Sequence, residues 1–239
     1  MNKMTKLAAA IALASGALSA PTMAVELSAN AGFVTDYYFR GVNLGDAGAY
    51  GGLDADLGAG FYAGTWIISD NGGEDGAFGD ASDPDTNDDG LETDFYVGWA
   101  TEFENGLGLD IAYNRYEYTY TSDYEDEYVI SAGFAGFGVS YFDGTAHGEE
   151  TGGTDTDYDG YTFSWSGEVF GFLYGSVEND ETDDKSGHDW IELSASGEIA
   201  GLDVTAVLGK TTNVELSDST DGESGDGYFF LDVSKSFDL

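Results

Sequence analysis

The sequence predicts an all-β fold, an antiparallel up-and-down transmembrane β-barrel of about twelve strands. Three observations predict it. Apolar and polar residues alternate along long segments, short and long connections alternate between these segments, and no stretch after the N-terminus approaches the roughly 20 apolar residues that a helical span needs. Membrane insertion of the mature chain must therefore occur through strands.

The N-terminal segment has the pattern of a cleaved signal peptide. Lys3 and Lys6 form a basic start, residues 7–18 are apolar, and a small-x-small cleavage site ends at Ala24. We therefore expect residues 1–24 to be removed and residues 25–239 to form one β-barrel domain in the outer membrane of a Gram-negative bacterium.

The predicted strands are 26–40, 47–57, 60–70, 91–103, 107–119, 124–134, 137–143, 158–167, 170–178, 189–199, 202–211 and 227–238. The first of these, 26–40, is longer than the usual strand of about 5 to 6 residues. Its apolar face consists of Leu27, Ala29, Ala31, Phe33, Thr35, Tyr37 and Phe39, with Val34 the one apolar residue on the polar face. Segment 91–103 alternates in the same way from Leu91 to Phe103. One face of each strand suits lipid and the other suits water.

The connections sort into two classes that alternate along the chain. Short turns are expected at 58–59, 104–106, 135–136, 168–169 and 200–201, and longer polar loops at 41–46, 71–90, 120–123, 144–157, 179–188 and 212–226. Short periplasmic turns and longer extracellular loops are typical of outer-membrane barrels. A soluble β-sandwich has no physical reason to sort its loops by end, so this alternation favours the barrel. Aromatic residues near the strand ends, including Tyr37 to Phe39, suggest interface girdles.

Composition narrows the function classes. The sequence has 46 acidic residues and no cysteine, and the predicted mature part keeps five of the seven lysines and arginines, giving a formal charge of 5 − 46 = −41. Nucleic-acid binding is excluded because phosphate contacts need a basic surface. The absence of cysteine means that closure or packing, not disulfides, holds the fold. Such acidity also suits a saline habitat.

The segments NAGFVTDYYFRGV, GGLDADLGAGFYAGTW and DVSKSF carry a resemblance to a known family. They resemble the proteobacterial porin-type family known as TorF or Gcw-chp, whose members are predicted outer-membrane proteins of poorly defined function. The resemblance implies an outer-membrane barrel and a porin-like role. Independently of the resemblance, the expected partners of the protein are outer-membrane lipid and lipopolysaccharide, the barrel assembly machinery, and small solutes or cations.

The acidic residues on the inward faces carry the functional information. Candidate pore-lining residues are Asp36, Arg40, Asp54, Asp56, Glu92, Asp94 and Asp110. Because few cations oppose them, some of these acids must face water or bound cations. An open lumen would then prefer cations. The alternative is a lumen closed by side chains and an inward loop.

These features favour a passive channel for small solutes or cations. The second hypothesis is a non-conducting barrel that presents acidic extracellular loops for adhesion, calcium binding or envelope structure. An enzyme is not expected, since His147 and His188 are the only imidazoles and both fall in predicted loops without a catalytic partner.

Two loops contain the pattern D-x-[DN]-x-[DN]-G, which places oxygen ligands at alternate positions before a glycine turn. The candidate calcium ligands are Asp85, Asn87 and Asp89 in one copy, and Asp155, Asp157 and Asp159 in the other. Neither copy has the glutamate at position twelve, so an EF-hand is excluded. No other cofactor is expected.

Overall fold

The computed structural model describes residues 25–70, 90–119, 122–148, 155–180, 185–212 and 227–239. The predicted signal peptide, 1–24, lies outside the described residues. The strands are β1 (Glu26–Val34), β2 (Tyr37–Phe39), β3 (Val42–Gly45), β4 (Gly48–Gly58), β5 (Phe61–Asp70), β6 (Gly90–Glu102), β7 (Gly108–Tyr118), β8 (Tyr124–Phe134), β9 (Phe137–His147), β10 (Thr156–Ser166), β11 (Phe170–Asp180), β12 (Lys185–Ile199), β13 (Leu202–Thr212) and β14 (Gly227–Asp238).

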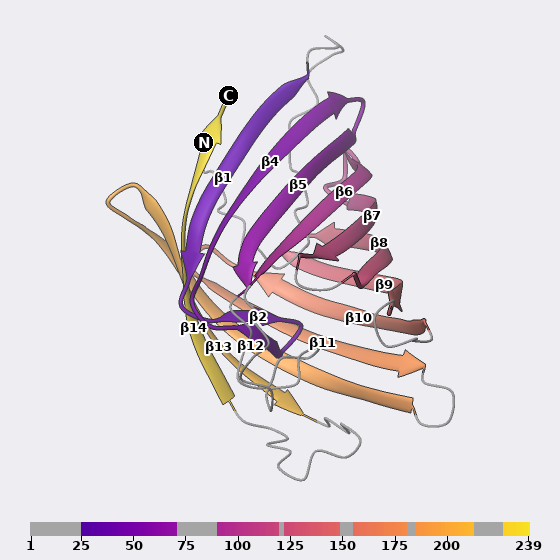
Figure 1. Ribbon diagram of the computed structural model, residues 1–239. Coiled ribbons are helices and arrows are strands. Elements are labelled where there is room, and N and C mark those ends of the chain that lie inside the picture. The colour runs from indigo at the N-terminus through magenta and orange to yellow at the C-terminus, as the bar shows by residue number, and fades with distance from the viewer. Residues whose placement is uncertain (1–24, 71–89, 120–121, 149–154, 181–184, 213–226) are drawn as a thin grey trace.

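Twelve of these strands form a closed antiparallel barrel, as the sequence predicted (Figure 1). From β4 to β14 each strand pairs with the next strand in the chain, and β1 closes the ring by pairing with both β4 and β14. Strands β2 and β3 form a separate two-stranded sheet. Within the described part of the chain, no helix is long and apolar enough to cross a membrane.

The two faces of the barrel differ as the alternation predicted. On the outer face Leu53, Phe95 and Ile111 are about half exposed, at 54%, 46% and 51%. On the inner face Glu92 and Asp110 are buried. An apolar outer face and a polar inner face together suit a barrel that is surrounded by lipid.

The short turns lie where the sequence predicted them, at the end of the barrel where β14 finishes, which we call the short-turn end. Ala135 and Gly136 have φ values of 52° and 85°, and Ala200 and Gly201 have 54° and 81°. Two successive residues with positive φ are typical of a type I′ turn, which matches the twist of a hairpin. The longer connections join the strands at the opposite end, the long-connection end.

Inside the barrel, aromatic rings lie over glycines of the neighbouring strand. In five places a tyrosine passes over such a glycine and donates its hydroxyl hydrogen bond to a carboxylate one strand further on. The sets are Tyr50, Gly32 and Asp232; Tyr62, Gly98 and Asp110; Tyr96, Gly64 and Asp54; Tyr158, Gly144 and Glu125; and Tyr228, Gly209 and Glu192. Each set ties three consecutive strands together.

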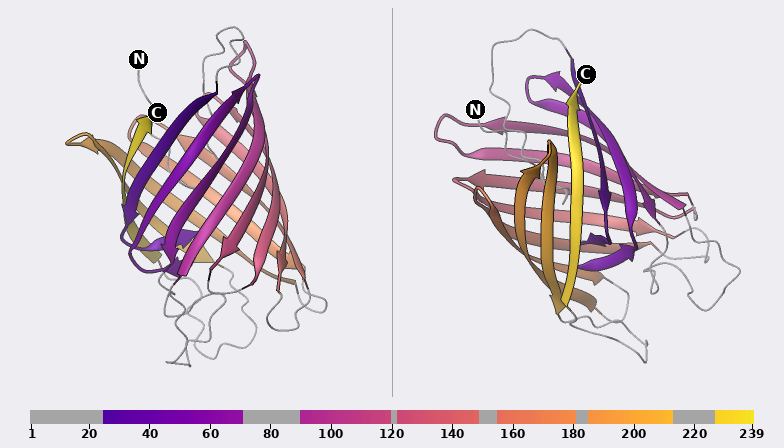
Figure 2. Two further views of the ribbon diagram at one scale, coloured as in Figure 1. Left: turned by 45° about the horizontal axis from the view of Figure 1, so that its top comes forward. Right: turned by 90° about the vertical axis from the view of Figure 1, so that its left-hand side faces the viewer.

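The prediction for the first strand was wrong beyond Val34. The barrel strand β1 ends there, and β2 and β3 turn into the lumen as a hairpin (Figure 2). Tyr37 to Phe39 are thus lumen residues, not part of a lipid-interface girdle, and residues 41–46 are not an outward loop. The alternation of apolar and polar residues continues past the end of β1, because Tyr37 and Phe39 suit a packed lumen as well as they suit lipid. The pattern therefore predicted a longer strand than the structure has.

Several strands are also longer at the long-connection end than predicted. Strand β9 extends to His147, β10 begins at Thr156 and β12 begins at Lys185. These extensions are polar, so the sequence suggested loops. Backbone pairing continues through them regardless, because strand hydrogen bonds do not depend on side-chain polarity.

Candidate functional site

The candidate site is the hairpin formed by β2 and β3. Together with the residues on either side it spans 35–47, and we call this segment the lumen hairpin. Its tip is a two-residue turn in which Arg40 and Gly41 both have positive φ, 50° and 80°. Phe39 pairs with Val42 on either side of this turn. An arginine in the left-handed region is uncommon, so its surroundings must hold it there.

Arg40 is held by an ion pair with the barrel wall. Its Nη2 lies 2.6 Å from Oε2 of Glu127, a side chain with no exposed surface. The same glutamate accepts hydrogen bonds from the Tyr116 hydroxyl at 3.2 Å and from the Asn114 amide at 3.3 Å. The guanidinium carbon also lies 3.6 Å from the ring centroid of Phe142. A buried carboxylate is therefore matched by one cation and two neutral donors.

The backbone of the turn is held from the opposite wall. The His188 ring donates from Nε2 to the Arg40 carbonyl at 2.8 Å, and the Thr211 hydroxyl donates to the Gly41 carbonyl at 2.5 Å. A Cβ on Gly41 would lie 2.6 Å from Cβ of Trp190, so only glycine fits. Both buried carbonyls are thus satisfied by side chains.

Aromatic contacts fix the arms of the hairpin. The Tyr37 hydroxyl donates to Oε1 of Glu92 at 3.0 Å. Burial, followed by the charge of Glu92, raises the pKa of the Tyr37 phenol well above its usual value, so the hydroxyl stays protonated and can donate. The Tyr38 ring stacks on Tyr228 with centroids 4.1 Å apart.

The lumen hairpin therefore crosses the barrel interior. Its partners come from β6, β7, β8 and β9 on one side and from β12, β13 and β14 on the other. Most of these partners lie toward the long-connection end of their strands, and Phe142 lies at the middle of β9. Figures 1 and 2 show the hairpin inside the ring, away from the C-terminus. The hairpin narrows this end of the lumen.

The predicted pore-lining residues occupy several different positions. Asp54 and Asp110 face the lumen and accept hydrogen bonds from Tyr96 and Tyr62. Glu92 and Asp94 are neighbours on the inner face of β6. Their pore-lining role stays a prediction.

The remaining candidates do not lie on the mid-lumen wall. Asp36 lies in the bend that leads into β2 and borders a cavity of about 30 Å³ between the lumen hairpin and the wall. Asp56 accepts a hydrogen bond from the Gly58 backbone at 2.7 Å, at the short-turn end. Arg40 is the hairpin tip. The structure therefore brings together Arg40, Glu92 and Asp94 near the hairpin but separates them from Asp56.

Sequence reasoning missed the partners of the lumen acids. It listed Arg40 as the one cation among the pore-lining candidates, whereas tyrosine hydroxyls donate hydrogen bonds to most of the lumen carboxylates. It also passed over Glu125, Glu127 and Glu192, which face the lumen from strands β8 and β12. One sequence feature could have predicted these partners. Several tyrosines occupy positions of the predicted strands whose side chains point into the barrel.

The candidate calcium ligands are only partly described. Asp85, Asn87 and Asp89 lie outside the described residues. Asp157 and Asp159 lie in β10, where Asp157 accepts from the Thr145 hydroxyl at 2.8 Å, and Asp155 lies 3.2 Å from Nδ1 of His147. In the described part of the chain, no three His, Cys, Asp or Glu side chains are grouped to hold a metal. Calcium binding stays a prediction.

The two histidines lie in strands, not in the loops that the sequence suggested. His188 lies in β12 and contacts the hairpin, and His147 ends β9, where its ring stacks on Tyr124 with centroids 4.5 Å apart. Both imidazoles thus have structural partners.

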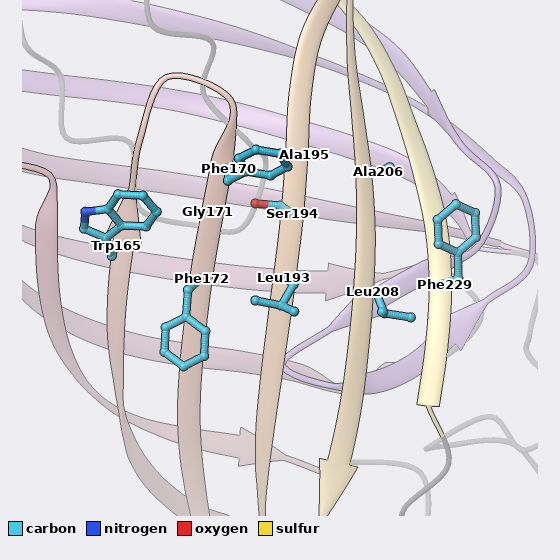
Figure 3. Close-up of a pocket in the computed structure, with 10 residues that line it drawn as sticks. All are labelled: Trp165, Phe170, Gly171, Phe172, Leu193, Ser194, Ala195, Ala206, Leu208 and Phe229. Carbon is cyan, nitrogen blue, oxygen red and sulfur yellow. The ribbon is translucent and has the colours of Figure 1, made fainter.

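A second hollow, of about 440 Å³, lies on the outer face of strands β10 to β14 (Figure 3). Its floor includes the small residues Ala195 and Ala206, and Trp165, Phe172 and Phe229 stand around it. Such an apolar hollow on the outer face of the barrel suits contact with lipid chains.

Comparison with solved structures agrees with this architecture. The KdgM porin matches with a TM-score of 0.53 at 7% identity, covering 88% of this chain and 99% of that one. OccAB4 of Acinetobacter baumannii has a TM-score of 0.45 at 9% identity, covering 87% of this chain and 57% of that one. OmpT of Vibrio cholerae has a TM-score of 0.41 at 9% identity, covering 89% and 96%. The first likeness shows the fold alone, a barrel of the outer-membrane porin type.

No curated protein has a sequence that matches this chain. One family model does, over residues 18–227, and its description is "Bacterial protein of unknown function (Gcw_chp)". The match spans most of the sequence and includes the first two of the three segments that carry the resemblance. The chain belongs to the Gcw_chp family.

Proposed function

We propose that this protein is a passive outer-membrane channel for small solutes, with a preference for cations. The observation that carries the proposal is the charge of the described lumen wall. Asp54, Asp110 and Glu192 are among its carboxylates, whereas Arg40 is the one arginine or lysine that faces this described lumen and is itself paired with Glu127. Arg115, Lys210 and Lys235 lie on the outer parity of their strands.

The tyrosine hydrogen bonds support a wall that stays negatively charged. A phenol that donates to a carboxylate satisfies one of its oxygens without cancelling its charge. A lumen lined by fixed carboxylates has a negative potential, which attracts cations and repels anions. The lumen hairpin narrows the path at the long-connection end, so we expect small solutes only.

A non-conducting barrel is the second candidate, and the same hairpin favours it. The hairpin contacts opposite walls and its polar groups are satisfied there, as expected of a permanent plug. The barrel would then present its acidic loops to the outside. Both proposals share three further features. We propose that the signal peptide is cleaved, that the short turns lie on the periplasmic side, and that the barrel is not an enzyme.

The selectivity test uses the acids of β6. Replacing Glu92 by Gln and Asp94 by Asn removes two lumen charges, and we expect the cation preference to fall. The matched control replaces Asp143 and Asp159, register partners on the outer face, by Asn. The measurement is the reversal potential of the refolded protein in a KCl gradient across a planar bilayer.

Salt dependence gives the second readout. The Debye length is about 8 Å at physiological salt and about 3 Å at 1 M, so cation preference should be strong in dilute KCl and fade in concentrated KCl. Anion preference of the unmodified protein would refute the proposal, as would a reversal potential that the lumen variants leave unchanged.

A further inference from the structure

The barrel does not need the lumen hairpin for its connectivity. Val34, the last residue of β1, is the register partner of Gly48, the first residue of β4. A two-residue turn could join such a pair directly. Instead the chain makes an excursion through residues 35–47, and the tip of that excursion places Arg40 against the opposite wall.

The pocket that receives Arg40 is built almost entirely by the wall. The carboxylate of Glu127 lies at its end, Phe142 presents its ring face at 3.6 Å from the guanidinium carbon, and Tyr158 lies at 5.9 Å. These residues come from β8, β9 and β10, and the hairpin adds Phe39 at 4.6 Å. A buried carboxylate beside aromatic faces is the chemistry by which proteins bind guanidinium and alkylammonium groups.

We propose that this pocket is a binding site for organic cations of the guanidinium and alkylammonium class, and that Arg40 occupies it as a tethered ligand. The inference rests on the proposed channel function, because only a conducted solute would reach the site from the lumen. An external cation competes with Arg40, and the hairpin leaves the wall when the cation binds. A tethered group has an effective concentration in the millimolar range, so competition requires millimolar solute.

The first experiment is chemical rescue in detergent solution. Arg40→Ala removes the tethered guanidinium and leaves Glu127 without its cation, so we expect a lower melting temperature. Ethylguanidinium chloride at millimolar concentration should raise the melting temperature of Arg40→Ala in a saturable way, because it binds only the folded barrel. The unmodified protein, in which Arg40 competes for the pocket, should show a smaller rise that needs a higher ethylguanidinium concentration.

The control for the pocket is Glu127→Gln. In the Arg40→Ala background this change removes the carboxylate charge, and it should weaken ethylguanidinium binding about tenfold or more. Glu192 is a lumen glutamate that accepts a hydrogen bond from Tyr228. Glu192→Gln should leave the rescue by ethylguanidinium unchanged. The proposal is overturned if ethylguanidinium stabilises Arg40→Ala no more than the unmodified protein, or if the Glu127→Gln background responds equally.

A second variant keeps the proposal testable if Arg40→Ala does not fold. Replacing residues 35–47 by Asn-Gly removes the whole hairpin and opens the pocket, and calorimetry should then show saturable ethylguanidinium binding that depends on Glu127. Absence of binding to this folded barrel would contradict the site. Both readouts are independent of conductance, so a barrel that binds the cation but is silent in a bilayer would refute the channel and not the pocket.

Discussion

Replacing Gly64 by alanine will destabilise the barrel by about 3 kcal/mol, the combined effect of overpacking and of weakening a charge-assisted hydrogen bond. A Cβ on Gly64 would lie closer than 3.0 Å to the Tyr96 ring, which is below any normal contact. The ring must swing away, and its hydrogen bond to Asp54 is lost. Unfolding by urea in lipid vesicles or micelles measures the change.

The same chain provides the control for this substitution. Gly197 lies in strand β12, and a Cβ there would meet no atom within 4 Å, so Gly197→Ala should change stability little. In a double-mutant cycle, Tyr96→Leu should remove most of the cost of Gly64→Ala. If Gly64→Ala costs as much in the Tyr96→Leu background as in the unmodified protein, the ring is not the cause.

Replacing Glu127 by alanine will release the lumen hairpin. Removing one partner of a buried ion pair costs about 3–5 kcal/mol, because the other charge stays buried and uncompensated. Arg40 can avoid this cost by leaving the lumen, since the barrel closes without the hairpin. We therefore expect the barrel to persist while Arg40 becomes accessible to water.

Limited trypsin digestion measures this release, because trypsin cleaves after arginine and lysine. Cleavage after Arg40 should be slow in the unmodified protein and fast in Glu127→Ala, as read by mass spectrometry. The control is Glu117→Ala, which breaks the more exposed pair with Arg115, a pair worth about 0–1 kcal/mol. Equal protection of Arg40 in Glu127→Ala would mean that the ion pair does not hold the hairpin.

The barrel could be predicted from local sequence because its strands have two different faces. Along β6, Leu91, Phe95 and Val97 are exposed while Glu92 is buried, and this contrast is written in the alternation itself. The positions of short turns follow in the same way, since Ala-Gly pairs between alternating segments supply the positive φ that a tight hairpin requires.

The lumen hairpin could not be predicted from local sequence, because its determinants are distant in the chain. Tyr37 and Phe39 continue the alternation of β1, so no local feature marks its end at Val34. Glu127 and His188, which hold the tip, follow Arg40 by 87 and 148 positions. Each is an ordinary strand residue on its own, and only barrel closure brings them to the same point.

The candidate site was therefore half predicted. The inner-face acids on β4, β6 and β7 were identified from their parity, and Arg40 was named as a lumen cation. The position of Arg40 at the tip of the lumen hairpin depends on tertiary contacts. The alternation of residues along a strand cannot predict such contacts. The tyrosine partners of the acids could have been found, because their inward parity follows from the same strands.

Single-channel recording with and without the lumen hairpin distinguishes a cation-preferring channel that the hairpin narrows from a barrel that does not conduct. The unmodified protein should give a small, cation-preferring conductance in dilute KCl. The variant in which Asn-Gly replaces residues 35–47 should conduct several-fold more while keeping its cation preference, because the wall acids remain. Absence of conductance in both proteins would contradict the channel, and equal conductance in the two would contradict a lumen narrowed by the hairpin.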